Sequence, residues 1–376
     1  MNGSAQSPRG APLLVHVFPT FAVGGAQVRF AALANRFGRE FRHMIVALDG
    51  VTSCRERLDP GLDVSFPIID APKNAMLGNA IRFRALLRQW RPDVLVTGNW
   101  GAIEFALANL PPLTRHLHVV DGFGPEEQQA QIRRRVLIRN LALRWGQVIV
   151  PSRNLERIAT GIWKLSPRVV RYVPNGIDLD RFTGGSRPAN DPPVIGTVAA
   201  LRPEKNVGRL IRAFASVARE RPARLVPARL VPARLVIVGE GPERAGLEAL
   251  TAGLGVAPMV TFTGHRTDTA DLYRSFDVFA LTSDTEQMPL SVIEAMASRL
   301  PVLATRVGDV PAMLSRENAD FVGPRDDAAI ARLMTALLAR PDHWAAIGQA
   351  NRAKAERDYA QETMFESWRA LWSGRT

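Results

Sequence analysis

Short apolar runs alternate with longer stretches of helical periodicity along most of the chain. The first run, LLVHVF at 13–18, ends at Pro19 and is followed by a glycine-bearing loop and a helical pattern over 26–37. Short apolar runs bounded by turn residues are typical of strands buried on both faces of a parallel sheet. The alternation continues, with further strands expected at 43–49, 93–98, 116–121 and 147–152 and helices at 81–90 and 133–145.

The alternation starts again after residues 174–182, beyond a linker rich in Gly, Ser, Pro and Asn at 184–193. Because strands that alternate with helices form doubly wound parallel sheets, we predict an α/β protein of two Rossmann-like domains that face a central cleft. The expected domains are 1–174 and 175–361, with a helix over 362–376 that packs back on the N-terminal domain. In the second half, strands are expected at 194–200, 235–241, 260–264, 277–283 and 301–308, and helices at 206–220, 243–255 and 291–298.

One segment departs from this rhythm. Residues 223–236 state the pentapeptide ARLVP twice and begin it a third time. Proline at every fifth position excludes a single helix, and the segment is too short for a repeat architecture. We interpret it as an expanded helix-to-strand loop whose last copy, ARLVIVG, forms the strand. Residues 1–11 are expected to be a disordered leader.

The charge of the chain is unevenly distributed. Of a net charge of +12, an excess of eleven lies in residues 1–175, which hold 23 Lys and Arg against 12 Asp and Glu. Such asymmetry indicates an anionic partner of the N-terminal half: lipid headgroups, a phosphorylated acceptor or nucleic acid. The helix expected at 133–145, RRRVLIRNLALRW, has Arg on one side and Val, Leu and Ile on the other. It is either a core-facing helix with a solvated Arg face or a helix that docks on an anionic bilayer.

The remaining composition excludes several classes of protein. A single cysteine, Cys54, rules out an internal disulfide framework and a Cys-based zinc site. No run approaches 18 apolar residues, so we expect no transmembrane helix. Residues 9–26 read better as a buried strand and a glycine turn than as a signal peptide. We therefore expect a cytoplasmic protein, with peripheral attachment to the inner face of the membrane left open.

The strongest chemical signal is TSDTEQMPLSVIEAMASRLPVLAT at 282–305. Glu286 follows an expected strand, and Glu294 lies on the next helix with seven residues between them. A carboxylate accepts two hydrogen bonds from the hydroxyls of a sugar, and the helix N-terminus beside it attracts a diphosphate. The alternative is that Glu286 caps the helix and Glu294 faces water.

This segment resembles the signature of the family 4 glycosyltransferases, which have the GT-B fold and retain the anomeric configuration. In that family the first Glu holds the transferred sugar and the second the ribose, so the resemblance implies these roles for Glu286 and Glu294. It also implies contacts to the nucleotide sugar from Met288, Leu290 and Ser291. The positions that match are Glu286, Glu294, Ala295, Met296, Ala297, Pro301, Val302, Ala304 and Thr305.

Three further segments are similar to the family in the expected order. RPEKN at 202–206 resembles the phosphate-binding loop, in which Lys205 matches the family lysine. The family arginine would fall at Ala200, and Arg202 is the candidate to replace it. GEGPER resembles the glycine turn below the nucleotide, and FTGHRTD the loop that contacts the base. The nucleotide-binding residues that these two segments imply are Gly239, Gly241, His265 and Arg266.

The N-terminal half, the expected acceptor domain, matches more loosely. Residues 19–34 resemble the family's first strand-loop-helix, where Gly24 and Gly25 let the backbone approach a donor phosphate or an acceptor. A family His beside the reacting carbon has candidates in HLHVVDGFGPEE, of which we favour His118, with Asp121 or Glu126 as alternatives. Asn99 and Trp100 follow another strand, where open α/β sheets place ligands, although a buried structural Trp fits equally well.

The resemblance implies a retaining glycosyltransferase. The donor would be a UDP- or GDP-linked sugar, and the acceptor a glycan or lipid-linked glycan of the cell envelope or exopolysaccharide. Neither a metal nor another cofactor is expected, because Lys205, Arg202 and the helix dipole supply positive charge. The DLD sequence at 178–180 lies away from the expected phosphate site.

Two alternatives stay open. One is a nucleotide-sugar epimerase or phosphorylase on the same fold, and the other is a basic nucleic-acid-binding module. Nucleic-acid binding would give the residues of the segment at 282–305 no role, and nucleic acid is not an expected partner. A dehydrogenase is excluded because VGGAQV after the first strand lacks the pattern G-x-G-x-x-G.

Overall fold

A computed structural model describes residues 10–70, 72, 75–127, 130–183, 190–219 and 233–375. The chain forms two compact units, and the following descriptions treat each by itself. Unit 1 comprises residues 1–174 and 363–376, and unit 2 comprises residues 175–362. The chain therefore leaves unit 1 once and returns to it at its last helix.

Unit 1 contains a seven-stranded sheet with the order β3-β2-β1-β4-β5-β6-β7, and all of its strand pairs are parallel. The first strand lies inside the sheet, and the strand order reverses beside it, between β1 and β4. This is the doubly wound order of Rossmann folds, extended by one strand. The strands are β1 Leu13–Phe18, β2 Arg42–Ala47, β3 Val64–Ser65, β4 Val94–Gly98, β5 Arg115–Val119, β6 Gln147–Val150 and β7 Val170–Tyr172.

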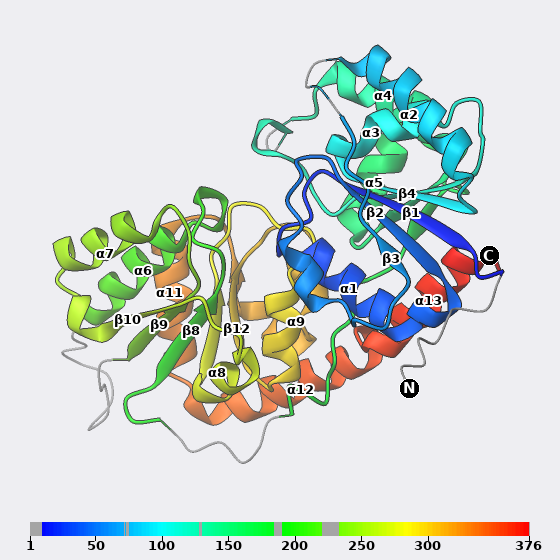
Figure 1. The fold of residues 1–376 in the computed structure, drawn as a ribbon. Coiled ribbons are helices and arrows are strands. Elements are labelled where there is room, and N and C mark those ends of the chain that lie inside the picture. Colours follow the sequence, from blue (N-terminus) through cyan, green and yellow to red (C-terminus); the bar gives the residue numbers. More distant parts are fainter. Residues whose placement is uncertain are drawn as a thin grey trace. The chain divides into compact units, whose positions relative to one another are not determined.

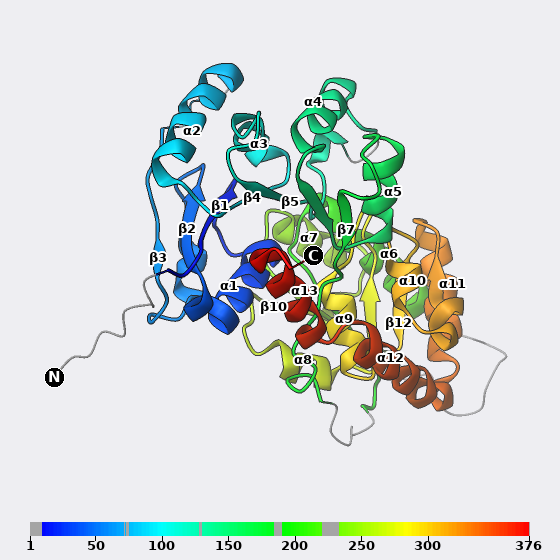
Figure 2. The ribbon, with the colours of Figure 1, turned by 90° about the vertical axis from the view of Figure 1, so that its right-hand side faces the viewer.

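Helices cover both faces of this sheet (Figures 1 and 2). On one face α1 packs beside α13, the helix that ends the chain, and the rings of Phe37 and Phe365 meet at 5.8 Å. The other face is covered by α2, α3, α4 and α5. The helices are α1 Gly25–Phe37, α2 Met76–Trp90, α3 Ile103–Ala108, α4 Arg133–Leu143, α5 Arg153–Gly161 and α13 Gln361–Ser373.

Unit 2 repeats the same plan with six parallel strands in the order β10-β9-β8-β11-β12-β13. Counted from its own first strand, this is the Rossmann order, and it reverses between β8 and β11. The strands are β8 Val194–Val198, β9 Arg234–Val238, β10 Val260–Gly264, β11 Val278–Leu281, β12 Val302–Thr305 and β13 Val322–Gly323.

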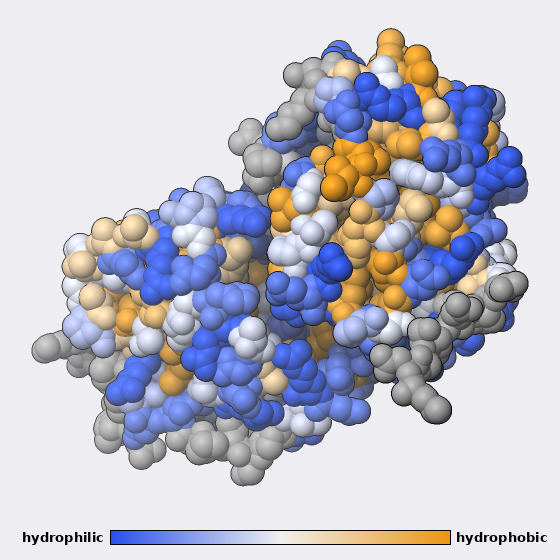
Figure 3. Space-filling view, in the orientation of Figure 1, coloured by the Kyte–Doolittle hydropathy of each residue, from blue (hydrophilic) through white to orange (hydrophobic). Residues whose placement is uncertain are grey.

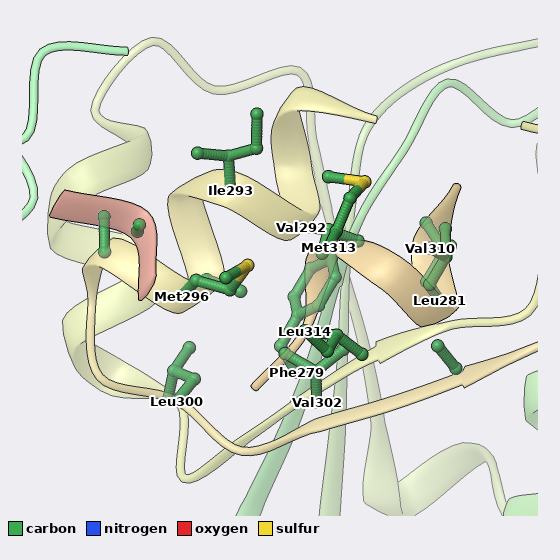
Figure 4. Close-up of a cluster of buried hydrophobic side chains, with 14 of the residues drawn as sticks. Phe279, Leu281, Val292, Ile293, Met296, Leu300, Val302, Val310, Met313 and Leu314 are labelled. Carbon is green, nitrogen blue, oxygen red and sulfur yellow. The ribbon is translucent and has the colours of Figure 1, made fainter. Parts of the chain in front are cut away.

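Two hydrophobic clusters hold the helices of unit 2 against opposite faces of its sheet. One cluster joins α6, α7 and α11 to the sheet, the other joins α8, α9 and α10, and α12 contributes to both. Figure 4 shows how Val292 and Met296 of α9 lie among Phe279, Leu281 and Val302 of the strands below. The helices are α6 Val207–Arg219, α7 Arg244–Gly253, α8 Thr269–Ser275, α9 Leu290–Ala297, α10 Val310–Met313, α11 Asp327–Leu338 and α12 Trp344–Asp358.

The expected α/β architecture is confirmed, and the differences are local. Three short strands, β3, β7 and β13, were not expected. A helix forms within 133–145 as predicted, but its expected division into an arginine side facing solvent and an apolar side facing the core is wrong in part. α4 buries Arg139 and exposes Leu137 and Leu141. The third copy of the pentapeptide enters β9, whereas its first two copies, like residues 1–9 and 184–189, lie outside the described residues.

Among the described residues, no helix combines the length and the apolar character that crossing a bilayer requires.

Candidate functional site

The predicted donor residues of unit 2 gather at the carboxyl ends of β8 and β11, where the strand order reverses. Open α/β sheets bind ligands in this crevice, because the loops that leave the two strands run in opposite directions. The loop after β8 carries Lys205 in the short helix η5 Pro203–Lys205, and the loop after β11 carries Glu286. Strand order alone therefore brings together residues that are 81 positions apart.

Lys205 and Glu286 form an ion pair in which Lys205 Nζ lies 2.6 Å from Glu286 Oε1. The Ser283 hydroxyl donates to the same carboxylate oxygen at 2.7 Å, and the Glu286 side chain is only 8% exposed. Ser283 is held in turn, since its carbonyl accepts a bond from the Thr305 hydroxyl at 2.7 Å. The pair thus has a fixed position, with the Lys205 side chain 26% exposed.

A second network fixes the two loops to each other. The side chain of Asn206 donates to Asp284 at 3.0 Å, and Arg209 pairs with Asp284 at 2.8 Å while also donating to the Thr282 carbonyl. Asn206 adopts a left-handed conformation, φ 41°, which Asn tolerates better than most residues, and its side chain caps α6 through the N–H of Arg209. Lys205 therefore leaves a rigid turn.

Glycines allow backbone segments to approach the site closely. A Cβ on Gly308 would lie 2.1 Å from the Glu286 carbonyl oxygen. Gly239 and Gly241, in the turn after β9, pass equally close to the loop after β8, where a Cβ would meet the carbonyl oxygens of Ala199 and Leu201 at 1.9 and 2.3 Å. The glycine turn is thus packed directly under the Lys205 loop.

Glu294 projects from α9 and is bound by Tyr273, whose hydroxyl donates to Glu294 Oε2 at 2.9 Å. The same hydroxyl lies 3.1 Å from the carbonyl oxygen of Ser291, with which it shares its one hydrogen. Burial raises the pKa of Glu294, and the Tyr273 hydrogen bond and the charge of Arg181 oppose that rise. Glu294 is thus a largely buried carboxyl whose orientation depends on one tyrosine.

The N-terminus of α9 begins at Leu290 and has no side-chain cap. The N–H of Val292 donates to the Pro289 carbonyl at 3.2 Å, and no partner of the N–H groups of Leu290 and Ser291 is recorded among the described residues. These two N–H groups and the helix dipole can therefore attract an anion. Met288, just before it, is buried, and its carbonyl accepts a bond from the Asn175 side chain at 3.1 Å. Leu290 and Ser291 open the helix and are half-buried.

Three predicted residues of unit 2 lie on exposed loops. Arg202 precedes η5 with an extended backbone, and no partner of its side chain is recorded within the described part of the chain. Arg266 pairs with Asp268, and His265 beside it is exposed. Ala200, where the family arginine would fall, is exposed as well. The arginine that the loop after β8 offers near Lys205 is Arg202.

In unit 1, Gly24 caps the N-terminus of α1 and Gly25 is its first residue. Nearby, at the carboxyl ends of β1 and β4, a cavity of about 50 Å³ is lined by residues that include Gln27, Asn99, Asp121 and Trp368. Asp121 pairs with Arg29 at 2.6 Å, and its backbone N–H donates to Asn99. Asp121, one of the three candidates, therefore lines this cavity.

His118 is 2% exposed, and its Nδ1 lies 2.7 Å from the Thr97 hydroxyl, which also contacts His116 at 2.8 Å. Burial, followed by the charges of His116 and Arg139, lowers the pKa of His118 well below its usual value. His118 is therefore a neutral imidazole within the sheet layer. Glu126, the remaining candidate, is exposed and pairs with Arg135.

Several residues of the site were missed by sequence reasoning. Ser283 had a usable signal, because it leaves the same strand as Glu286 and lies three residues before it. Tyr273 and Arg209 had none, since their partners Glu294 and Asp284 are brought to them by packing alone. Trp100 is half-buried against the guanidinium groups of Arg135 and Arg139, at 4.8 and 5.0 Å.

Models of two protein families match consecutive parts of the chain. "Glycosyltransferase Family 4" matches residues 23–181, and "Glycosyl transferases group 1" matches residues 181–354. A D-inositol 3-phosphate glycosyltransferase of Saccharomonospora viridis is 31% identical over 216 residues, which are 52% of this chain and 48% of that protein. A GDP-mannose-dependent alpha-mannosyltransferase of Mycobacterium tuberculosis is 36% identical over 161 residues, 40% of this chain and 36% of that protein.

The chain spans about half the length of several curated relatives that it matches. Among solved structures, Anabaena HepE in complex with UDP and glucose superposes with a TM-score of 0.79. The match covers 96% of this chain and 100% of that chain at 18% identity. This likeness identifies the fold as GT-B.

Proposed function

The chain belongs to the family 4 glycosyltransferases, and on that premise we propose that it transfers a sugar from a nucleoside-diphosphate donor to a hydroxyl group with retention of configuration and without a metal. The observation that carries the proposal is the Lys205–Glu286 pair at the strand-order reversal of unit 2, beside the uncapped N-terminus of α9. One cation, one carboxylate and one helix N-terminus match the diphosphate and hydroxyl groups of such a donor.

The two carboxylates have separate roles in this proposal. Ser283 and Lys205 both contact Oε1 of Glu286 and so hold its carboxylate in place. In this proposal the carboxylate accepts hydrogen bonds from hydroxyls of the transferred sugar. Glu294 accepts from the ribose, with its Oε2 already oriented by Tyr273. Lys205 exchanges part of its contact with Glu286 for the diphosphate when the donor binds.

Negative charge builds on the diphosphate as the bond from its oxygen to the anomeric carbon breaks. Lys205, the N–H groups of α9 and Arg202 stabilise that charge, and these positive groups take the place of a metal. The acceptor oxygen bonds to the anomeric carbon on the same face, through an oxocarbenium-like transition state. The acceptor proton leaves on the released nucleoside diphosphate.

The acceptor that we propose is a glycan or lipid-linked glycan, bound by unit 1. Its support is the positive charge excess of residues 1–175 and the cavity beside Asp121. The HepE structure contains UDP, and the Mycobacterium relative is GDP-mannose-dependent by name, so both nucleotides belong in the test.

Calorimetric titration with UDP-, GDP- and ADP-sugars, with and without EDTA, tests the donor site. Glu294→Ala is expected to abolish binding of the preferred donor, whereas Glu317→Ala, an exposed carboxylate of the same unit, leaves it unchanged. EDTA is expected to have no effect. If no donor binds to the folded protein, the assignment of the donor site is wrong.

Product formation separates the remaining alternatives. A glycosyltransferase releases nucleoside diphosphate in proportion to the hydroxyl acceptor consumed. Conversion of the donor without an acceptor would indicate an epimerase, and dependence on phosphate would indicate a phosphorylase. Binding of nucleic acid in place of any sugar nucleotide would contradict the proposal entirely.

A further inference from the structure

The exposed apolar residues of this protein are concentrated in one unit. Every exposed large hydrophobic side chain found among the described residues belongs to unit 1. Single exposed apolar residues are ordinary, whereas neighbouring exposed apolar residues that form a patch mark interaction surfaces. These side chains are Val23, Val51, Ile68, Leu77, Ile81, Leu113, Ile132, Leu137, Leu141, Trp145 and Ile162.

Three of them form a stripe along α4. Leu137 is 71% exposed, Leu141 43% and Trp145, just beyond the helix, 57%. Residues four apart lie on one face of a helix, so the three side chains form a single outward stripe. The opposite side of α4 is buried through Arg139, Ala142 and Leu143.

Cations flank this stripe. Arg133, Arg134 and Arg144 are exposed, and no ion pair to any of the three is recorded within the described ranges. The Arg144 guanidinium lies 4.2 Å from the centre of the Trp145 ring. Solvated arginines beside exposed leucine and tryptophan are typical of helices that lie in the interface of an anionic bilayer.

A second stripe lies on α2, in the same layer of helices. Leu77 is 82% exposed and Ile81 is 74% exposed, four residues apart, with Arg88 exposed further along the helix. Both ribbon views place α2, α3 and α4 together over one face of the sheet, and α3 contacts both neighbours (Figures 1 and 2). The surface over these helices shows hydrophobic residues interspersed with hydrophilic ones (Figure 3).

We propose that the outward faces of α2 and α4 form a membrane-docking surface for an anionic phospholipid bilayer. Leu77, Ile81, Leu137, Leu141 and Trp145 enter the interface, and Arg133, Arg134 and Arg144 contact lipid phosphates. The positive charge of unit 1 favours an anionic bilayer over a neutral protein surface, because the attraction between solvated arginines and anionic headgroups stabilises binding. This proposal adds a lipid bilayer to the partners of the protein, and it rests on the proposed glycosyltransferase function.

Flotation with phosphatidylcholine vesicles, with and without phosphatidylglycerol, tests the surface in the absence of any sugar nucleotide. The full chain is expected to float with the anionic vesicles and to dissociate at about 1 M NaCl, where the Debye length falls to about 3 Å. Arg133→Gln/Arg134→Gln and Leu137→Ser/Leu141→Ser are each expected to lower the partition coefficient on the order of tenfold.

Arg332→Gln/Arg340→Gln, which removes the same charge from exposed positions of unit 2, is the matched control and is expected to bind as the unchanged chain does. All substituted side chains are exposed, and unchanged circular dichroism confirms folding. Donor binding by calorimetry should remain intact in the unit 1 variants, so failure of docking and failure of the proposed function are separate results.

Trp145 provides an independent readout, because it alone of the seven tryptophans is exposed. Brominated lipids are expected to quench part of the fluorescence of the full chain and none of that of Trp145→Phe. Equal binding to neutral and anionic vesicles, or unchanged binding of both double variants, would overturn the proposal. So would conversion of a dimer to a monomer by Leu137→Ser/Leu141→Ser with vesicle binding unchanged, because the stripe would then join two copies.

Discussion

Removing one partner of the buried ion pair between α4 and the loop after β5 should strongly destabilise unit 1. Arg139 donates to both carboxylate oxygens of Glu127, at 2.8 and 2.6 Å, and the two side chains are 4% and 0% exposed. The Arg139 guanidinium also lies 4.8 Å from the ring of Trp163 and 5.0 Å from that of Trp100. Burial raises the pKa of Glu127, but the hydrogen bond and charge of Arg139 and the hydrogen bonds of Arg135 and the Ile132 backbone outweigh it and lower the pKa below its usual value.

Arg139→Met keeps the apolar stem and removes the charge, which leaves a buried carboxylate with Arg135 as its remaining cation. Breaking a buried pair from one side costs about 3–5 kcal/mol. Glu127→Gln should also destabilise unit 1, because it leaves Arg139 buried without its carboxylate. The double variant carries no isolated charge, so its cost should fall below the sum of the two single costs by about 2 kcal/mol or more.

Urea unfolding followed by tryptophan fluorescence measures this cycle, because six of the seven tryptophans lie in unit 1 and two of them surround Arg139. Arg82→Met is the matched control, since Arg82 and Asp70 form an exposed pair whose loss should cost less than about 1 kcal/mol. Additive costs in the double variant, or a cost for Arg139→Met no larger than that of the control, would refute the reasoning.

Three further predictions concern other parts of the molecule. Tyr273→Phe removes a hydrogen bond that lowers the pKa of Glu294, so donor binding should be lost at a higher pH on acidification than in the unchanged chain; calorimetry across pH checks this, and an unshifted midpoint contradicts it. Gly239→Ala places a Cβ against the Ala199 carbonyl at φ 140° and should lower the melting temperature of unit 2, whereas Gly246→Ala, in open space on α7, should raise it slightly. Burial lowers the pKa of His43 to about 4 from 6.5, so its contribution to stability is present above pH 6.5 and is lost as pH falls toward 4. The free energy of unfolding of unit 1, measured by urea titration, should therefore be lower by about 2 kcal/mol at pH 5 because of this histidine, and His43→Phe should reduce the pH dependence.

The sequence predicted the strands that carry an apolar run. LLVHVF became β1 without adjustment, because a strand buried on both faces is rich in apolar residues, and His16, the polar residue of this run, is buried with them. β3 and β13 are two residues long and contain no run to recognise. They exist because the neighbouring strands β2 and β12 leave an edge to which a short segment can pair.

The residues of the candidate site likewise fall into those that the sequence pattern predicted and those that it did not. Lys205 and Glu286 follow the first and fourth strands of unit 2, and the Rossmann order makes these strands neighbours, so their approach followed from the pattern. Arg139 could not be placed from periodicity, because its burial depends on Glu127. The expected place of His118 beside the reacting centre stays a prediction, and the pattern did not reveal that its ring bonds Thr97, its register partner on β4.

The return of the chain to unit 1 has a consequence for its synthesis. Phe365, Trp368 and Trp372 of α13 belong to the core that also contains Phe30 and Phe37 of α1. These residues emerge from the ribosome only after all of residues 175–362. The whole sequence of unit 2 is therefore available for folding before that of unit 1 is. The usual N-to-C order of cotranslational folding is therefore inverted, and the first domain to be translated is the last that can close its core.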